Sequence, residues 1–228
     1  MTPHVPIDVE ELKCDFAICS AYKLFSRRGS FMYGRKELLE KLQPYKVEPS
    51  SNSPPTKWEM GTRDQALFAS IRAVTDYLNW LGGEVQRDVG GGLGKYSGRR
   101  RLLKAALTWI EQYEQTLSMT MLDGTENALG LSKLRGLEVY GLKDTASIHL
   151  RCPTFSFNIK GADPKSVADF LWKKHAITVF AQDFYSRALK TYNVPTAIRA
   201  SLVHCNTVRE VETFLAALAN TLEHFKVT

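Results

Sequence analysis

The last third of the chain alternates segments of strand character with segments that begin as helices do. Three short segments have the apolar run or the period-two alternation of strands: 154–159, 177–180 and 198–203. Asp163 and Pro164 supply an N-cap and a first-turn proline for a helix through Lys174, and Thr207 with Glu210 forms a capping box for a final helix. This order predicts a compact α/β domain with helices on a small mixed sheet.

Two long amphipathic helices precede that domain. After Asp64, an N-cap residue, apolar positions recur at helical spacing until Gly82 and Gly83, where we expect the helix to stop. A second helix follows a glycine-rich loop at residues 90–98. Its apolar stripe consists of Leu103, Ala106, Ile110, Tyr113 and Leu117.

The amino-terminal region contains two further strand-like segments. Residues 15–22 (Asp-Phe-Ala-Ile-Cys-Ser-Ala-Tyr) form an apolar run bounded by charge, which predicts a buried strand, and Ser30–Gly34 predicts a second one. Residues 46–57 combine prolines, serines and an asparagine, so they predict a loop that crosses between layers.

Composition narrows the class of protein. The 228 residues are 44% hydrophobic and 24% charged, which are ordinary globular values. No apolar run approaches the roughly 18 residues of a membrane helix, and the first residues lack the pattern of a signal peptide, so we expect a soluble cytoplasmic protein. The net charge is +6, and part of this excess comes from a few local runs such as Arg99–Arg101. Such a mild excess does not by itself predict a nucleic-acid partner.

The cysteines and histidines give no sign of a metal site. Cys14, Cys19, Cys152 and Cys205 form neither a Cys-x-x-Cys pair nor a zinc-binding pattern with histidine. We therefore expect reduced thiols and no metal.

Two short motifs fail in their context. Residues 90–95 (Gly-Gly-Gly-Leu-Gly-Lys) lack the spacing, the following Ser or Thr and the preceding strand of a phosphate-binding loop. Ser20 and Lys23 match the Ser-x-x-Lys of penicillin-recognising hydrolases, but that motif needs a helix start where we expect a strand, and no Lys-Thr-Gly is present.

Two cations on predicted strands leave alternatives open. Lys23 ends an apolar strand, where it either exits to solvent or lies in a desolvated site that lowers its pKa. Arg199 lies with Ser201 on the polar side of an alternating strand, where it is either simply exposed or clamps a carboxylate with two parallel hydrogen bonds.

Several segments, in their order along the chain, resemble the carboxy-terminal portion of the class V aminotransferase family, the pyridoxal-phosphate-dependent group that includes cysteine desulfurases. The first segment runs from His4 to Phe25 and contains Lys23, and the similarity continues in Tyr33-Gly-Arg35. The second is Glu59-Met-Gly-Thr62. The third comprises residues 151–157 (Arg-Cys-Pro-Thr-Phe-Ser-Phe), 176–179 (Ala-Ile-Thr-Val) and 199–207 (Arg-Ala-Ser-Leu-Val-His-Cys-Asn-Thr).

This resemblance implies roles for five residues. Lys23 is similar to the lysine that forms a Schiff base with pyridoxal 5'-phosphate and then moves protons at the substrate α carbon. Ser20 matches a donor to the cofactor phosphate, and Tyr22 stands where relatives often have histidine. Thr62 matches a threonine that reaches the cofactor of the neighbouring subunit, which implies a homodimer. Arg199 matches the arginine that holds the carboxylate of an amino-acid substrate.

The resemblance also implies a fold of type I with two parts. Residues 1–60 are expected to be the tail of the large cofactor-binding domain, and residues 61–228 the interdomain helices and a small C-terminal α/β domain. Family members have a large amino-terminal half that supplies the acidic partner of the cofactor ring and most of the phosphate site, and this half would precede Met1.

Three departures from the family pattern bear on function. The turn after the lysine is Ser26-Arg-Arg-Gly-Ser30, Arg63 replaces a common proline, and residues 181–186 (Ala-Gln-Asp-Phe-Tyr-Ser) lack the cysteine of one desulfurase branch. The last departure argues against persulfide chemistry by that route. We expect transamination or β-elimination of an amino acid, with a truncated, non-catalytic remnant or dimerisation module as the alternative.

Overall fold

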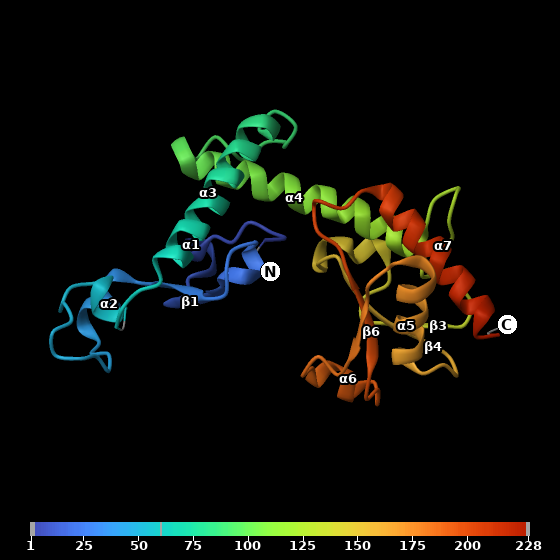
Figure 1. Ribbon diagram of the computed structural model, residues 1–228. Helices are drawn as coiled ribbons and strands as arrows, with labels where there is room; N and C mark the ends of the chain where they lie inside the picture. The colour runs from blue at the N-terminus through green and yellow to red at the C-terminus, as the bar shows by residue number, and fades with distance from the viewer. Residues whose placement is uncertain (1–2, 60, 227–228) are drawn as a thin grey trace. The chain divides into compact units, whose positions relative to one another are not determined.

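The computed structural model describes residues 3–59 and 61–226, which form two compact units, Met1–Trp109 and Ile110–Thr228 (Figure 1). Each unit is described by itself. The boundary between these units falls inside one long helix. The domain boundary expected near residue 60 concerns the complete family fold and stays a prediction.

The first unit contains a small sheet and two long helices. Its elements are α1 (Val9–Leu12), β1 (Phe16–Ser20), a 3-10 turn (Ala21–Leu24), β2 (Ser30–Gly34), α2 (Lys36–Lys41), a 3-10 turn (Thr56–Trp58), α3 (Gln65–Val85) and the first part of α4 (Gly98–Asp123). The segment expected as a loop, 46–57, is irregular up to that second 3-10 turn.

The sheet of the first unit is a two-stranded antiparallel hairpin. β1 pairs with β2 from Phe16 opposite Gly34 to Ser20 opposite Ser30. The prediction of a buried strand at 15–22 is wrong in two respects: the strand ends at Ser20, and Ile18 is 74% exposed. The reason is that β1 and β2 are both rich in apolar residues on both faces, and within the described part of this unit no layer buries them.

Helix α3 begins as predicted, because the Asp64 carboxylate accepts hydrogen bonds from the backbone N–H groups of Ala66 and Leu67. It does not stop at Gly82 and Gly83 but continues to Val85. A Cβ atom at Gly82 would lie 2.0 Å from the carbonyl oxygen of Leu102 in α4. Gly82 therefore serves the close approach of two helices rather than a helix end.

The glycine-rich loop at residues 90–97 connects α3 to α4, so no strand precedes it. Val89 and Leu93 at this connection pack with Ala105, and Trp109 lies against them. This small apolar cluster closes the helical hairpin of the first unit. Within the described residues, no helix is long and apolar enough to span a membrane.

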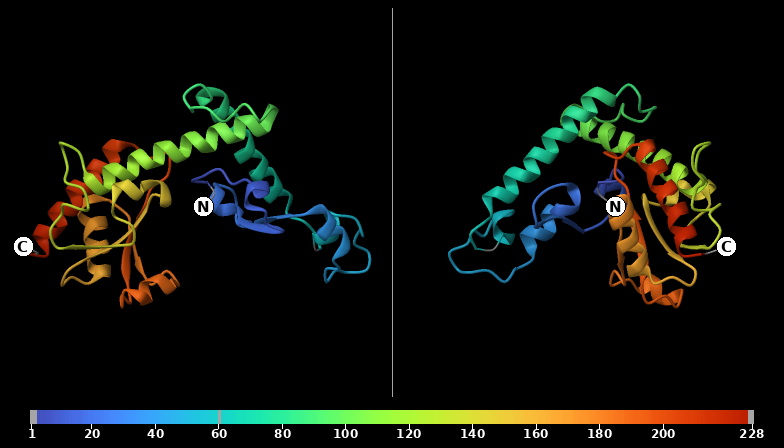
Figure 2. Two further views of the ribbon diagram at one scale, coloured as in Figure 1. Left: turned by 180° about the vertical axis from the view of Figure 1, so that it is seen from behind. Right: turned by 45° about the vertical axis from the view of Figure 1, so that its right-hand side comes forward.

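The second unit is a four-stranded sheet with helices, which confirms the predicted α/β class. After the end of α4 its elements are β3 (Leu137–Tyr140), a 3-10 segment (Thr145–Leu150), β4 (Thr154–Ile159), α5 (Pro164–His175), β5 (Phe180–Gln182), α6 (Arg187–Thr191), β6 (Ala197–Ser201) and α7 (Val208–His224). The strand order is β3-β4-β6-β5. Figure 2 shows this unit from two further sides, with the green helix α4 and the red helix α7 beside the strands. Every neighbouring pair is antiparallel, so the expectation of a mixed sheet is wrong.

Two predicted strands of this unit are shifted. Ala176 ends α5 in the left-handed conformation, and Ile177 N–H still bonds the Leu171 carbonyl, so the chain becomes a strand at Phe180 rather than at 177. At the other strand, Val203 N–H bonds the side chain of Asn206, which turns the chain soon after Ser201. Strand β3 was not predicted.

The helices cover one face of this sheet. Alternate residues of β4, namely Phe155, Phe157 and Ile159, are buried against α4, α5 and α7. The ring of Phe157 meets that of Phe214 of α7 edge to face, 6.3 Å between centroids. Both halves of the predicted capping box at Thr207 and Glu210 are present at the start of α7. The residues between the buried ones face the open side of the sheet.

Candidate functional site

The turn that carries Lys23 follows β1 directly. Ser20 precedes the 3-10 turn Ala21–Leu24, and its hydroxyl makes no capping hydrogen bond. Ala21 is fully buried and its N–H donates to the carbonyl of Gly29, which fixes the turn. Tyr22 and Lys23 are exposed, and Lys23 Nζ lies 5.9 Å from the Tyr22 ring centroid.

This turn corrects the sequence interpretation of Ser20 and Lys23. Ser20 is the last residue of β1 and also the N-cap of the 3-10 turn that carries Lys23, so the two residues begin and occupy one helical turn instead of both lying on a strand. The Ser-x-x-Lys motif is therefore not excluded by a strand, and the absence of Lys-Thr-Gly remains the argument against that hydrolase class.

The segment after Lys23 is held against the start of α3. Ser26 Oγ lies 2.6 Å from Ser70 Oγ, and the Arg27 guanidinium lies 3.7 Å from the Asp64 carboxylate. A Cβ atom at Gly29 would lie 2.5 Å from a methyl group of Leu67, and Gly29 has a φ of +149°. The serine and arginine residues that depart from the family pattern thus anchor this turn to α3.

Thr62 lies on the approach to α3, two residues before its N-cap. Its side chain is exposed, and Met60 of the same sequence segment lies outside the described residues. Arg63 pairs with Glu59 at 2.6 Å. In the described residues, no hydrogen bond joins Thr62 to Ser20, Tyr22 or Lys23. The structure thus places all four residues in the first unit and brings Ser20, Tyr22 and Lys23 together on one turn.

Arg199 lies on the open face of the sheet in the second unit, as the alternation of β6 predicts. Its neighbours Ile198 and Ala200 are buried on the helix face, and Arg199 itself is half-buried. Across the strands, Tyr140 is opposite Ser156, Ser156 is opposite Arg199, and Arg199 is opposite Phe180. Residues directly opposite one another share a face, so these four form one row on the open side.

The Arg199 guanidinium lines a cavity of about 400 Å³. It stacks on the ring of Phe184, with 4.2 Å from Cζ to the ring centroid. Arg199 Nε is buried without a hydrogen-bond partner, and in the described part of the chain the guanidinium has no ion pair. The wall of the cavity includes Tyr140, Ser156, Phe184, Leu189 and Tyr192. A half-buried cation without a counter-ion is suited to bind an anion.

Two tyrosines of this cavity are fixed by hydrogen bonds. Tyr192 Oη accepts from the backbone N–H of Gly141 at 3.2 Å, and Tyr140 Oη donates to the Glu138 carboxylate at 3.3 Å. Burial and the Glu138 carboxylate raise the pKa of Tyr140 above its ordinary value. Tyr140 thus presents a neutral phenol in the cavity that holds the cation. The sequence interpretation did not find Tyr140, Phe184 or Tyr192; the alternation of Leu137–Tyr140 is the signal that could have revealed the first.

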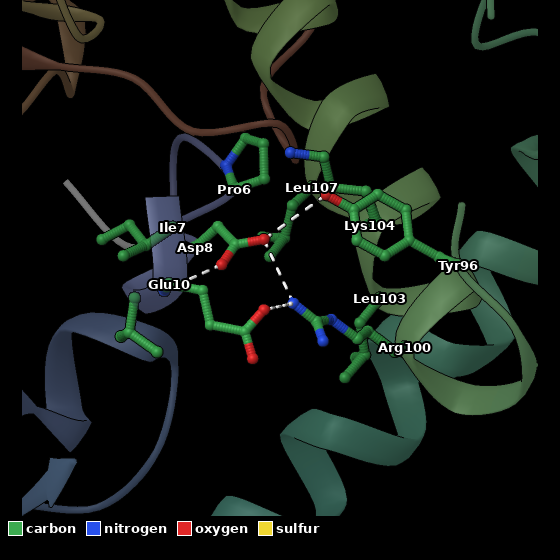
Figure 3. Close-up of a pocket in the computed structure, with 10 residues that line it drawn as sticks. Pro6, Ile7, Asp8, Glu10, Tyr96, Arg100, Leu103, Lys104 and Leu107 are labelled. Atoms are coloured by element: carbon green, nitrogen blue, oxygen red, sulfur yellow. Dashed lines mark hydrogen bonds and ion pairs between the residues drawn. The ribbon is translucent and has the colours of Figure 1, made fainter. Parts of the chain in front are cut away.

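A second cavity, of about 330 Å³, lies in the first unit beside α1 and the start of α4 (Figure 3). The carboxylates of Asp8 and Glu10 point toward the Arg100 guanidinium, each 3.2 Å from Arg100 Nη2. Burial opposes ionisation of Asp8, but hydrogen bonds from the Glu10 and Glu11 backbone and from Arg100 outweigh it and hold the pKa of Asp8 below its ordinary value. Because the single guanidinium is paired with both carboxylates, the cluster fits a structural role.

The cysteines supply neither a disulfide nor a metal site. None of the four, all of which lie in the described part of the chain, forms a disulfide. Burial raises the pKa of the Cys152 thiol, and Cys205 Sγ lies 3.8 Å from His204 Nε2. Among residues 3–59 and 61–226, no three His, Cys, Asp or Glu side chains gather to hold a metal ion.

Comparison with known proteins agrees with these observations. The sequence pattern of the family described as aminotransferase class-V matches residues 1–90 and 101–214. A cysteine desulfurase of Serratia proteamaculans is 27% identical and a probable cysteine desulfurase of Halalkalibacterium halodurans 29% identical; the alignments cover 94% and 98% of this chain but 47% and 49% of those proteins. The chain thus spans about half the length of the curated relatives it matches.

Solved structures show the same fold. A cysteine desulfurase from Escherichia coli superposes with a TM-score of 0.69, and the apo cysteine desulfurase from Thermococcus onnurineus with 0.72, both at 22% identity. These superpositions cover 96% and 97% of this chain and 49% and 50% of the two structures. The neighbours confirm the predicted fold of type I and agree with the predicted carboxy-terminal portion.

Proposed function

Because the chain belongs to the aminotransferase class-V family, we propose that it is a pyridoxal-phosphate-dependent, cysteine desulfurase-like protein that acts on an amino acid. The observation that carries the proposal is the unpaired guanidinium of Arg199 in a cavity on the open face of the sheet. An amino-acid substrate always brings the carboxylate that such a cation lacks. Since the chain spans about half the length of its relatives, the activity is proposed for the protein in which the rest of the family fold is supplied.

The turn at Lys23 fits the expected cofactor. A primary amine on an exposed turn is open to an aldehyde, and the Ser20 hydroxyl, which caps no backbone group, is available to donate to a phosphate. Tyr22 contributes a neighbouring ring to the same turn. We propose that Lys23 holds pyridoxal 5'-phosphate through its amine, that Ser20 and Tyr22 bind its phosphate side, and that Thr62 reaches the cofactor of a second copy in a homodimer.

Bound there, pyridoxal phosphate would supply electron withdrawal from the substrate α carbon, which is the difficult part of amino-acid chemistry. The residues of the chain supply the rest. Arg199 would fix the α-carboxylate in two parallel hydrogen bonds, and Phe184 would hold the guanidinium plane in place. Lys23 would accept and return the proton at the substrate α carbon.

The reaction class follows from the loop before α6. Residues 181–186 carry no cysteine, and in this structure the loop presents Phe184 to Arg199 instead. We therefore propose transamination or β-elimination rather than sulfur transfer through a cysteine of this loop.

An amino-acid titration tests the proposal. The protein loaded with pyridoxal phosphate is titrated with L-amino acids while the cofactor absorption is followed, for the wild type and for Arg199→Lys. The lysine keeps the charge but removes the two-pronged geometry, so binding should weaken by about 1.5–3 kcal/mol. Arg209→Lys, on the first turn of α7 away from the cavity, is the control. Equal midpoints for wild type and Arg199→Lys would remove Arg199 from the site.

A second candidate is a non-catalytic interaction or dimerisation module of the same family. It is favoured by the exposed apolar side chains of β1 and β2, among them Ile18, Phe31 and Met32. The module would keep the fold without using the cofactor. Specific attachment of pyridoxal phosphate to Lys23 would argue against it.

A further inference from the structure

We propose that the cavity around Arg199 selects substrates whose side chain is apolar and flat, so that the substrate class is an aromatic amino acid rather than a small polar one. The inference rests on the proposed function, which assigns the substrate carboxylate to Arg199. It adds the chemical class of the substrate side chain. The inference about the substrate side chain is drawn from the residues that line the cavity in this chain, and not from the cysteine desulfurase relatives.

The first support is the pair of tyrosine rings that lines the same cavity as the cation. The rings of Tyr140 and Tyr192 lie 5.4 Å apart between centroids at an angle of 46°. Tyr192 is held by the Gly141 N–H and Tyr140 by Glu138, so the pair is fixed without a ligand. A fixed pair of rings offers an apolar surface on which a third ring stacks at little entropic cost.

The second support is the strained turn that positions Phe184. Phe184 and Tyr185 both have positive φ values, 54° and 51°, which residues with a Cβ atom seldom adopt. Tyr185 N–H donates to the Asp183 carboxylate at 3.1 Å and stabilises the turn. The turn places the Phe184 ring over one face of the Arg199 guanidinium. A ring on the face leaves the N–H donors in the guanidinium plane directed at a carboxylate.

The third support is what the cavity lacks. Its lining between the aromatic residues consists of small or aliphatic residues, such as Gly141, Ser186, Ala188 and Leu189. Arg199 is the charged residue of the lining, and neither a carboxylate nor an amide side chain belongs to it. Apart from Arg199, the polar side chains of the lining are the hydroxyls of two serines and two tyrosines, so a substrate with a charged side chain would lose water without gaining a second counter-charge. The volume of about 400 Å³ suits a small ligand with one ring.

Three small ligands distinguish the contribution of the carboxylate to binding from the contribution of the aromatic ring. The 228-residue chain, without cofactor, is titrated with 3-phenylpropionate, propionate and 2-phenylethylamine, and binding is followed by the amide resonances of Gly141 and Ser156. We expect 3-phenylpropionate to bind at least tenfold more tightly than propionate, and 2-phenylethylamine to leave these resonances unchanged. Equal binding of the two acids, or binding of neither, would overturn the inference.

Variants of Tyr192 test whether its ring causes the preference for an aromatic ligand. Tyr192→Ala should reduce the preference for 3-phenylpropionate to less than threefold, whereas Tyr192→Phe, which keeps the ring, should retain it. Tyr185→Ala is the control, because Tyr185 lies just before α6, as Tyr192 lies just after it, but is 96% exposed and does not line the cavity. An unchanged preference in Tyr192→Ala would contradict the proposal.

Arg199→Lys separates this inference from the proposed function. It should weaken both acids by the same factor, at least tenfold, without changing the ratio between them. If the two acids bind equally but both need Arg199, the aromatic selection fails and the carboxylate contact stands. If both bind Arg199→Lys as well as wild type, the contact assigned in the proposed function fails.

Discussion

The two sheets of the molecule differ in what covers them. In β3-β4-β6-β5, apolar residues alternate with polar ones, and the apolar set lies under α4, α5 and α7. In β1 and β2, apolar residues follow one another on both faces, and Ile18, Phe31 and Met32 are exposed in this structure. Alternation of apolar and polar residues thus indicates a sheet whose covering helices lie in the same segment of sequence. A continuous apolar run indicates strands that the helices of their own segment do not cover.

The same contrast separates the two proposed contacts. Arg199 stands on the open face of an alternating strand, so the sheet itself presents the guanidinium beside a cavity. Lys23 stands on a turn after a continuous apolar strand, held by Ala21 and by contacts to α3. The proposed substrate contact is therefore built within one unit, and the proposed cofactor turn is an exposed element of the other.

The largest expected effect tests the covered sheet against the uncovered one. Phe157→Ala removes a fully buried ring from the core under α7 and should cost about 3–5 kcal/mol of unfolding free energy. Ile18→Ala, in the uncovered hairpin, should cost under about 1 kcal/mol, because its side chain is exposed. Urea unfolding followed by circular dichroism measures both. Equal losses would contradict the contrast between the sheets.

The next effect concerns the helical hairpin of the first unit. Gly82→Ala drives a Cβ atom into the Leu102 carbonyl and should destabilise the hairpin by about 1–3 kcal/mol. Gly83→Ala meets no atom within 4 Å and should stabilise α3 by up to about 1 kcal/mol through helix propensity. Thermal unfolding of the two variants should shift in opposite directions. A shift of the same sign would show that α3 and α4 do not approach at Gly82.

The smallest effect concerns pH and the packing of α7. Hydrogen bonds from Thr125 Oγ1, at 2.6 Å, and from Asn127 hold the pKa of Glu212 below its ordinary value of 4.5. A lowered folded-state pKa contributes stability above the unfolded value, which is lost as the pH falls through the folded value. Glu212→Gln should therefore flatten the decline of the melting temperature below about pH 4.5.

Glu126→Gln provides the control for that measurement, since Glu126 belongs to the same turn as Thr125 and Asn127 and its side chain is exposed. Its melting temperature should follow the pH dependence of the wild type. A Glu212→Gln variant that declines as steeply as the wild type would remove this carboxylate as a source of acid sensitivity.

Much of the second unit could be predicted because its signals are local. The period-two alternation gave the bounds of β4, and the capping box of Thr207 and Glu210 gave the start of α7. The start of β5 could not be predicted in the same way, since the left-handed conformation of Ala176 extends the end of α5 through Ile177. Strand β3 is four residues long, and its place in the sheet depends on pairing with β4.

In the candidate site, too, the features set by neighbours in sequence could be predicted, and those set by distant contacts could not. Arg199 could be placed on the open face from its neighbours in sequence, but Tyr140, Phe184 and Tyr192 meet it only through strand pairing and the loop before α6. The apolar run predicts a strand through Tyr22, whereas the chain turns at Ala21, whose N–H donates to the carbonyl of the distant Gly29. Contacts between distant segments thus account for what the sequence did not predict.

Borohydride trapping tests the central claim, that Lys23 holds the cofactor. The purified protein is incubated with pyridoxal phosphate and reduced, and the modified lysines are mapped and quantified in the wild type, Lys23→Ala and Lys36→Ala, the last removing an exposed surface amine of α2. The proposed function predicts one dominant modified peptide, containing Lys23, that is lost in Lys23→Ala and retained in Lys36→Ala. Labelling spread over surface lysines, and unchanged in Lys23→Ala, would contradict it and favour the non-catalytic module.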